Sequence, residues 1–139
     1  MKNDVPVAEV MTPHPRSVQV SQQLSDVRAA LADRRLHHLP VVDGHRLVGI
    51  ISTTDLLEFG FEPRDSVETR DKYLNEHFPI SAVMQTEVVT IPGSSTVRDA
   101  ARALATGTLH AVRVVDEDQN LVGIVTSTDI VSYFLSQTG

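Results

Sequence analysis

Two stretches of the chain bring hydroxyl and carboxylate side chains together directly after an apolar run. They are GIISTTDL at 49–56 and GIVTSTDI at 123–130. Their candidate binding residues are Ser52, Thr54 and Asp55 in the first stretch and Thr126, Thr128 and Asp129 in the second. An ionised carboxylate accepts several hydrogen bonds, and a hydroxyl both donates and accepts. Such a set suits recognition of a polar ligand, or an acid–base pair if the two carboxylates share one site.

Both stretches belong to an internal repeat that spans most of the chain. Val10-Met11 recurs as Val83-Met84, 73 residues later. The segment LHHLPVVD at 36–43 recurs as LHAVRVVD at 109–116, and the two candidate stretches close the two copies. Motifs that recur in the same order indicate two copies of one folded unit.

The duplication bears on whether the chain is an enzyme. Two copies place Asp55 and Asp129 in separate, equivalent sites, which suits binding twice and does not suit an acid–base pair. The sequence also contains no nucleophile elbow, phosphate-binding glycine loop or metal-binding helix motif. We therefore expect a binding protein without catalytic activity.

Each copy is predicted to fold as β-α-β-β-α. Short β-branched runs at 17–20 and 88–91 indicate strands. Apolar residues at helical spacing follow each run, and Thr96 with Asp99 resembles a capping box. Two further strands are joined through Asp43-Gly44, a hairpin signal, and a helix is expected just after each Thr-Asp pair. The residues expected in or near the core are Leu39, Val41, Val48 and Ile50, with their second-copy equivalents.

The fold class expected from these elements is α/β (α+β), built from two such motifs. We assign residues 1–60 to the first motif, 61–79 to a connector and 80–139 to the second motif. Asp65 with Glu68 is expected to cap a short amphipathic helix in the connector. That helix packs on its own domain, or it covers a ligand or partner, and the sequence leaves its role open. One motif leaves a sheet face uncovered, so the two motifs are expected to pack against each other.

The bulk composition excludes several classes of partner. The 139 residues carry a formal net charge of −6 and only 4% aromatic residues. These values disfavour nucleic-acid binding through basic patches or stacked rings. No apolar run approaches the length of a membrane-spanning helix, and without cysteine there is neither a disulfide nor a thiolate site. Because the sequence shows no targeting signal, we expect a cytoplasmic location.

Three motifs, in order and twice over, resemble a tandem pair of cystathionine-β-synthase (CBS) domains, often called a Bateman module. They are the VMTP opening at 10–13, the H-x-L-P-V-V-D segment at 37–43, and the Gly-to-Asp ending of each copy. The second copy departs from this pattern, because VMQT at 83–86 lacks the Thr-Pro step and Arg113 stands where Pro40 does.

The resemblance implies a fold in which the two motifs pair through their sheets about a pseudo-twofold axis, with two clefts between them. It implies a stand-alone regulatory or sensory module that binds AMP, ADP, ATP or S-adenosylmethionine as a regulatory ligand, with no cofactor. It also implies a homodimer and an effector protein that the sequence does not identify. The expected helices DLLEF and DIVSYFL offer more apolar area than one copy can cover, which supports the homodimer.

The candidate residues suit an adenosyl ligand chemically. A carboxylate can accept hydrogen bonds from both ribose hydroxyls, so Asp55 and Asp129 are the expected ribose ligands. Thr126 and Thr128 alternate along the expected strand end, which would turn both hydroxyls to one side, toward phosphate. Three histidines occupy positions where the family's His or Arg reaches phosphate: His37, His38 and His110. No metal site is expected at His37-His38, because adjacent strand residues point to opposite faces.

Two other interpretations of the same residues stay open. A Ser/Thr-x-x-Asp stretch before a helix is an ordinary helix cap, in which the Asp bonds its own backbone. The cap can coexist with ligand binding. If it is the only role, the chain is a ligand-free assembly or interaction module with vestigial clefts.

Overall fold

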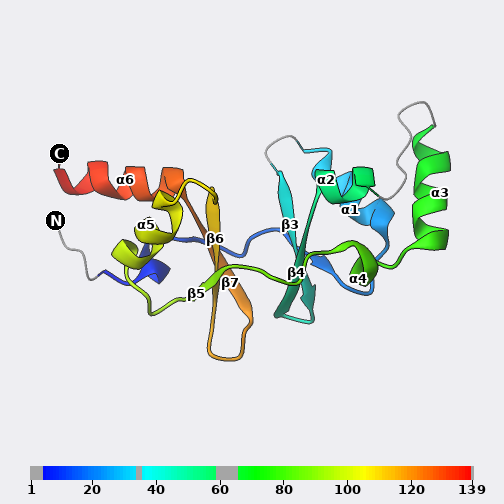
Figure 1. Ribbon diagram of the computed structural model, residues 1–139. Coiled ribbons are helices and arrows are strands. Elements are labelled where there is room, and N and C mark those ends of the chain that lie inside the picture. Colours follow the sequence, from blue (N-terminus) through cyan, green and yellow to red (C-terminus); the bar gives the residue numbers. More distant parts are fainter. Residues whose placement is uncertain (1–4, 34–35, 59–65, 139) are drawn as a thin grey trace. The chain divides into compact units, whose positions relative to one another are not determined.

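The computed structural model describes residues 5–33, 36–58 and 66–138. The chain forms two compact units, one of residues 16–88 and one of residues 1–15 with 89–139. We call them the central unit and the terminal unit. Each unit holds one small sheet with its own helices (Figure 1). The mixed α+β fold class is therefore confirmed.

The central unit contains a three-stranded sheet in the order β2-β3-β4. Its strands are β2 (Val18–Gln19), β3 (His38–Asp43) and β4 (Arg46–Ser52). Its helices are α1 (Leu24–Leu31), α2 (Thr53–Glu58), α3 (Val67–His77) and α4 (Ile80–Val83). Strands β2 and β3 are parallel, with α1 between them in sequence, and β3 and β4 form the expected antiparallel hairpin. Gly44 takes a φ of +67° in its turn, a conformation that favours glycine.

The core of the central unit differs from the predicted one at Ile50. Leu39 and Val41 are buried as predicted, whereas Ile50 is half-buried and Ile51 is fully buried. The reason is the hairpin register, which pairs Leu39 with Ile51. Residues directly opposite each other across an antiparallel pair share a face of the sheet. Ile51 therefore enters the core beside Leu39, and Val48 packs against that core while half-buried.

The terminal unit contains a four-stranded sheet in the order β1-β7-β6-β5. Its strands are β1 (Thr12–Pro13), β5 (Thr90–Pro92), β6 (Ala111–Val115) and β7 (Leu121–Thr126). Its helices are α5 (Val97–Ala105), α6 (Ser127–Thr138) and the short 3-10 helix η1 (Val7–Glu9). The predicted capping box at the start of α5 is confirmed, because Thr96 and Asp99 each accept a hydrogen bond from the other's backbone N–H.

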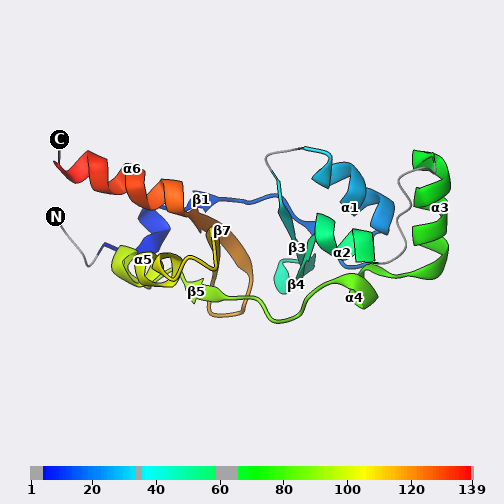
Figure 2. The same cartoon turned by 45° about the horizontal axis from the view of Figure 1, so that its top comes forward.

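The compact units do not coincide with the two sequence repeats. The opening segment of the first repeat pairs with the last strand of the second, through β1 and β7 (Figure 2). The opening segment of the second repeat pairs with the last strand of the first, where Ile50 and Gln85 form an isolated bridge. Each opening segment thus covers a strand edge that would otherwise leave backbone groups unpaired. The two units therefore each contain parts of both repeats.

The connector helix α3 packs on the central unit. Leu74 is 1% exposed and belongs to the core of that unit. The Arg28 guanidinium of α1 donates two hydrogen bonds to Asp71, at 2.6 and 3.0 Å. Ser25 and Asn75 form a reciprocal pair of hydrogen bonds beside it. The cap of α3 differs from the expected one: Ser66 is the N-cap and accepts from the Thr69 N–H, whereas Asp65 lies outside the described residues.

Candidate functional site

Both candidate stretches cross a junction between a strand and a helix. Strand β4 ends at Ser52 and α2 begins at Thr53, and β7 ends at Thr126 where α6 begins at Ser127. Thr54 and Thr128 therefore lie in the first turn of a helix. The expectation that Thr126 and Thr128 alternate along one strand is wrong, because the chain changes from strand to helix between them. A ligand role for Thr54 and Thr128 stays a prediction.

Asp55 is buried and its carboxylate is well supplied with donors. The side chain is 8% exposed. Its Oδ2 accepts from the Ser52 N–H at 2.8 Å and from the Ser52 hydroxyl at 3.0 Å. Its Oδ1 accepts from the Gln85 side-chain amide at 3.0 Å. These three bonds take up most of the roughly four acceptor positions of a carboxylate.

Asp129 has the same place in the second copy but fewer partners. Its Oδ2 accepts from the Thr126 N–H at 2.8 Å, and its own N–H donates to the Thr126 hydroxyl oxygen at 3.1 Å. Among the described residues no donor reaches Oδ1, and no acceptor takes the Thr126 hydroxyl proton. Asp129 is half-buried. A carboxylate oxygen without a donor and a hydroxyl whose proton has no acceptor, among the described residues, thus lie at the start of α6.

The three histidines lie near these junctions but are exposed. The hairpin register places His38 opposite Ser52. In the second copy, Ala111 stands opposite Thr126, and the His110 carbonyl accepts from the Ser127 N–H at 3.2 Å. His37 precedes β3. His38 and His110 therefore lie close to the two junctions in the folded units, and the contact of the three histidines with phosphate stays a prediction.

Arg113 is a candidate binding residue that sequence reasoning did not assign. It pairs with Ile124 while Ala111 pairs with Thr126, so Arg113 and Thr126 lie on one face of the sheet. The side chain is partly buried, burial lowers the pKa of its guanidinium from the ordinary value, and its Nε has no hydrogen-bond partner among the described residues. The sequence signal was an arginine inside an apolar strand, where the first copy has Pro40.

Comparison with known families decides the identity of the chain. The CBS domain family model matches residues 7–62 and again residues 80–136. The chain belongs to the CBS domain family. The two matches follow the two sequence repeats, so the tandem pair inferred from the motifs is confirmed.

Curated relatives of this CBS pair are longer proteins. An uncharacterized protein of Methanocaldococcus jannaschii is 30% identical over 127 residues, which are 91% of this chain and 37% of that protein. A second uncharacterized protein of the same organism is 28% identical over 136 residues, covering 94% of this chain and 32% of that protein. The chain thus spans about a third of the length of these two relatives.

Solved structures share the fold over nearly the whole chain. CBSX2 in complex with AMP is 26% identical, with a TM-score of 0.76, and the match covers 97% of this chain and 99% of that one. CBSX2 is a CBS-pair protein of Arabidopsis thaliana. The CBS domain of a membrane protein from Sphaerobacter thermophilus is 27% identical, with a TM-score of 0.72, covering 94% of this chain and 88% of that one.

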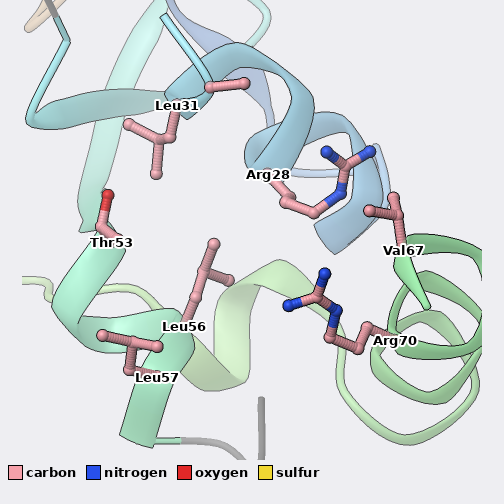
Figure 3. A pocket seen from close by; sticks show the side chains of 8 residues that line it. Arg28, Leu31, Thr53, Leu56, Leu57, Val67 and Arg70 are labelled. Carbon is pink, nitrogen blue, oxygen red and sulfur yellow. The ribbon is translucent and has the colours of Figure 1, made fainter. Parts of the chain in front are cut away.

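Two pockets lie within the units of the CBS pair, and neither Asp55 nor Asp129 lines them. One of about 220 Å³ lies between α1, α2 and α3, and its lining includes three leucines and two arginines: Leu31, Leu56, Leu57, Arg28 and Arg70 (Figure 3). Another of about 580 Å³ lies in the terminal unit, beside β5 and the turn after β6. No group of three or more His, Cys, Asp or Glu side chains that could hold a metal occurs in the part of the chain that the structure describes. In that same part, no helix is long and apolar enough to span a bilayer.

Proposed function

We propose that this CBS pair is a regulatory module that binds an adenosine-containing nucleotide and is not an enzyme. The observation that carries the proposal is the half-buried Asp129 carboxylate, which has one oxygen without a donor among the described residues. The AMP complex of CBSX2, a CBS-pair protein that this chain matches over 97% of its length, supports a nucleotide as the ligand. The candidate ligands are AMP, ADP, ATP and S-adenosylmethionine.

Three residues of the terminal unit each bind a different part of the ligand. Asp129 accepts hydrogen bonds from the ribose hydroxyls, for which an ionised carboxylate is a strong acceptor. The Thr126 hydroxyl, whose oxygen already accepts from the Asp129 N–H, donates its proton to the ligand. Arg113, on the same sheet face as Thr126, provides the positive charge for phosphate. A half-buried guanidinium is a favourable phosphate ligand because its charge is less screened than on an open surface.

Calorimetric titration with a ligand panel tests the proposal. The panel is AMP, ADP, ATP, S-adenosylmethionine, adenosine and GMP, each added to the parent protein. At least one adenosine-containing ligand is expected to bind, and GMP is expected to bind more weakly or not at all. The proposal fails if the parent protein binds none of the adenosine-containing ligands.

Arg113→Ala is expected to weaken binding of AMP, ADP and ATP about tenfold, the usual value of a hydrogen bond to a charged group. Binding of adenosine, which has no phosphate, should not change. The matched control is Arg98→Ala, which removes an exposed arginine of α5 in the same unit. Equal losses for AMP and adenosine would assign Arg113 a structural role and remove it from the site.

The second candidate function is a ligand-free assembly module with vestigial clefts. It is favoured by the hydrogen bonds of Asp55 and Asp129, because both carboxylates cap their own helices by accepting a backbone N–H three residues earlier. A cap needs no ligand. The ligand panel separates the two functions, since an assembly module would show no binding.

We also propose that the protein is a homodimer. On α6, Val131 and Phe134 are 57% and 48% exposed, and their spacing places them on one side of the helix. Asp129 is the only charged residue of α6, so two copies of this helix can meet with little like-charge repulsion.

Phe134→Glu is expected to convert the dimer to a monomer, because it places a charge in the apolar contact. Light scattering at micromolar concentration should give twice the chain mass of 15.2 kDa for the parent and that mass for the variant. Tyr73→Glu, which changes a 42% exposed aromatic residue of α3, is the control and should stay dimeric. A monomeric parent, with and without nucleotide, would reject the dimer.

A further inference from the structure

Gln85 is held in place against β4 and its side chain reaches Asp55. Its backbone N–H donates to the Ile50 carbonyl at 2.7 Å and its carbonyl accepts from the Ile50 N–H at 2.9 Å. These two bonds fix the backbone of Gln85 beside the strand that leads into α2. Its side-chain amide then donates to Asp55 Oδ1 at 3.0 Å.

The equivalent residue in the other copy is a threonine. Val10-Met11 is followed by Thr12, and Val83-Met84 is followed by Gln85. Thr12 lies opposite Ile124 in β7, as Gln85 lies opposite Ile50 in β4. The Thr12 side chain is shorter, and no hydrogen bond joins it to Asp129. The two copies therefore differ at the residue that decides whether Oδ1 of the carboxylate already has a donor.

We propose that Gln85 acts as an internal ligand of Asp55 and makes the two nucleotide sites unequal. The site at Asp129 binds first, and the site at Asp55 binds only weakly while Gln85 is in place. This inference rests on the proposed function. It adds that one residue, on a segment outside the Ser/Thr-x-x-Asp motif, sets the number of nucleotides bound.

Competition for the carboxylate provides the physical reason. A ribose that binds Asp55 through both hydroxyls must displace the Gln85 amide from Oδ1, because Ser52 already uses Oδ2 twice and only one acceptor position is left on Oδ1. The displaced amide loses a bond to a charged acceptor, so the exchange gains much less than binding to an unoccupied carboxylate. Asp129 requires no such exchange, because no described residue donates to its Oδ1.

Two reciprocal substitutions test the inference. Gln85→Thr gives the Asp55 site the residue of the Asp129 site, and Thr12→Gln does the opposite. The parent should bind one equivalent of AMP or ATP strongly. Gln85→Thr should gain a second equivalent, with affinity raised about tenfold or more at that site. Thr12→Gln should weaken the first equivalent by a similar factor.

Two further variants assign the sites. In the Gln85→Thr background, Asp55→Ala should remove the second equivalent, because that equivalent is assigned to the Asp55 carboxylate. Thr86→Ala, an exposed neighbour on the same segment, is the control and should change neither equivalent. Thermal melting of each variant checks that the fold is intact, because both Thr12 and Gln85 are exposed positions.

The outcomes separate this inference from the proposed function. The inference is overturned if the parent binds two equivalents equally well, or if it binds one equivalent and Gln85→Thr gains no second one. Nucleotide binding itself would still stand. No binding by the parent or by Gln85→Thr overturns both. If the parent binds no nucleotide and Gln85→Thr binds one equivalent at Asp55, Gln85 is an internal ligand, but the assignment of Asp129 as the first site is wrong.

Discussion

Asp129→Ala is expected to weaken AMP or ATP binding about a hundredfold while the fold stays intact. The variant loses a charged acceptor for two ribose hydroxyls, a loss of about 2–3 kcal/mol in binding free energy. It also loses the cap bond to the Thr126 N–H, which costs the free energy of unfolding only about 1 kcal/mol. Affinity should therefore fall far more than stability. Calorimetric titration and thermal melting of the same sample measure the two losses.

Asp99→Ala is the matched control for this experiment. Asp99 also lies in the first turn of a helix of the terminal unit and accepts a backbone N–H three residues earlier. No ligand role is proposed for it. The control should lose stability as a cap variant does and keep its nucleotide affinity. If Asp129→Ala binds the nucleotide as the parent does, both aspartates are caps only and the ribose assignment is wrong.

The calorimetric and melting experiments are best done near neutral pH, because the contribution of the Asp99 cap to stability depends on pH. The N–H and hydroxyl of Thr96 hold the pKa of Asp99 below its usual value. A depressed pKa in the folded state adds stability above the usual pKa, and that contribution is lost as the pH falls through the lowered value. At neutral pH the Asp99 cap therefore contributes fully to the stability of the parent, and Asp99→Ala measures its whole loss.

Local patterns in the sequence predicted the elements correctly where the information is local. The hairpin at Gly44 and the capping box at Thr96 depend on residues a few positions apart, and both are present. The repeat strengthened each assignment, because the same order of elements had to fit twice. The junction of strand and helix was misplaced, since TSTD reads equally well as a strand end or as the first turn of α6.

Contacts between distant segments could not be predicted in the same way. The bond from Gln85 to Asp55 joins residues 30 positions apart, and no periodicity marks the glutamine as its partner. Arg113 was visible as a departure from Pro40, but its burial depends on strands that meet only in the folded unit. The pairing of each opening segment with the last strand of the other repeat is non-local for the same reason.

Two glycines in those last strands mark where the opening segments approach closely. An added Cβ at Gly49 would lie 2.5 Å from the Met84 Sδ and 2.9 Å from the Gln85 carbonyl oxygen. An added Cβ at Gly123 would overlap the Met11 side chain, and its three nearest neighbours are all atoms of that side chain. The two positions are equivalent in the repeat. A backbone atom, the Gln85 carbonyl oxygen, is among the three nearest neighbours only at Gly49.

Gly49→Ala is expected to lower the free energy of unfolding by about 2 kcal/mol, the middle of the range for overpacking. Gly123→Ala should lower it by less than about 1 kcal/mol, because methionine has three rotatable bonds and can swing aside. At Gly49 the obstacle includes the Gln85 carbonyl, which accepts from the Ile50 N–H at 2.9 Å. Moving it breaks a bond that holds the opening segment on β4. Denaturant unfolding of both variants measures the difference.

Double-mutant cycles with the two methionines separate side-chain overlap from backbone overlap. Combining Gly123→Ala with Met11→Ala should recover most of the cost of the glycine substitution, because the three atoms nearest the new Cβ all belong to the Met11 side chain. Combining Gly49→Ala with Met84→Ala should recover only part of it, because the Gln85 carbonyl stays in place. Since Gln85 also donates to Asp55, Gly49→Ala should loosen that bond and raise affinity at the Asp55 site. Full recovery in both cycles would show that the backbone of Gln85 is not fixed against β4, and the proposed internal ligand would lose its support.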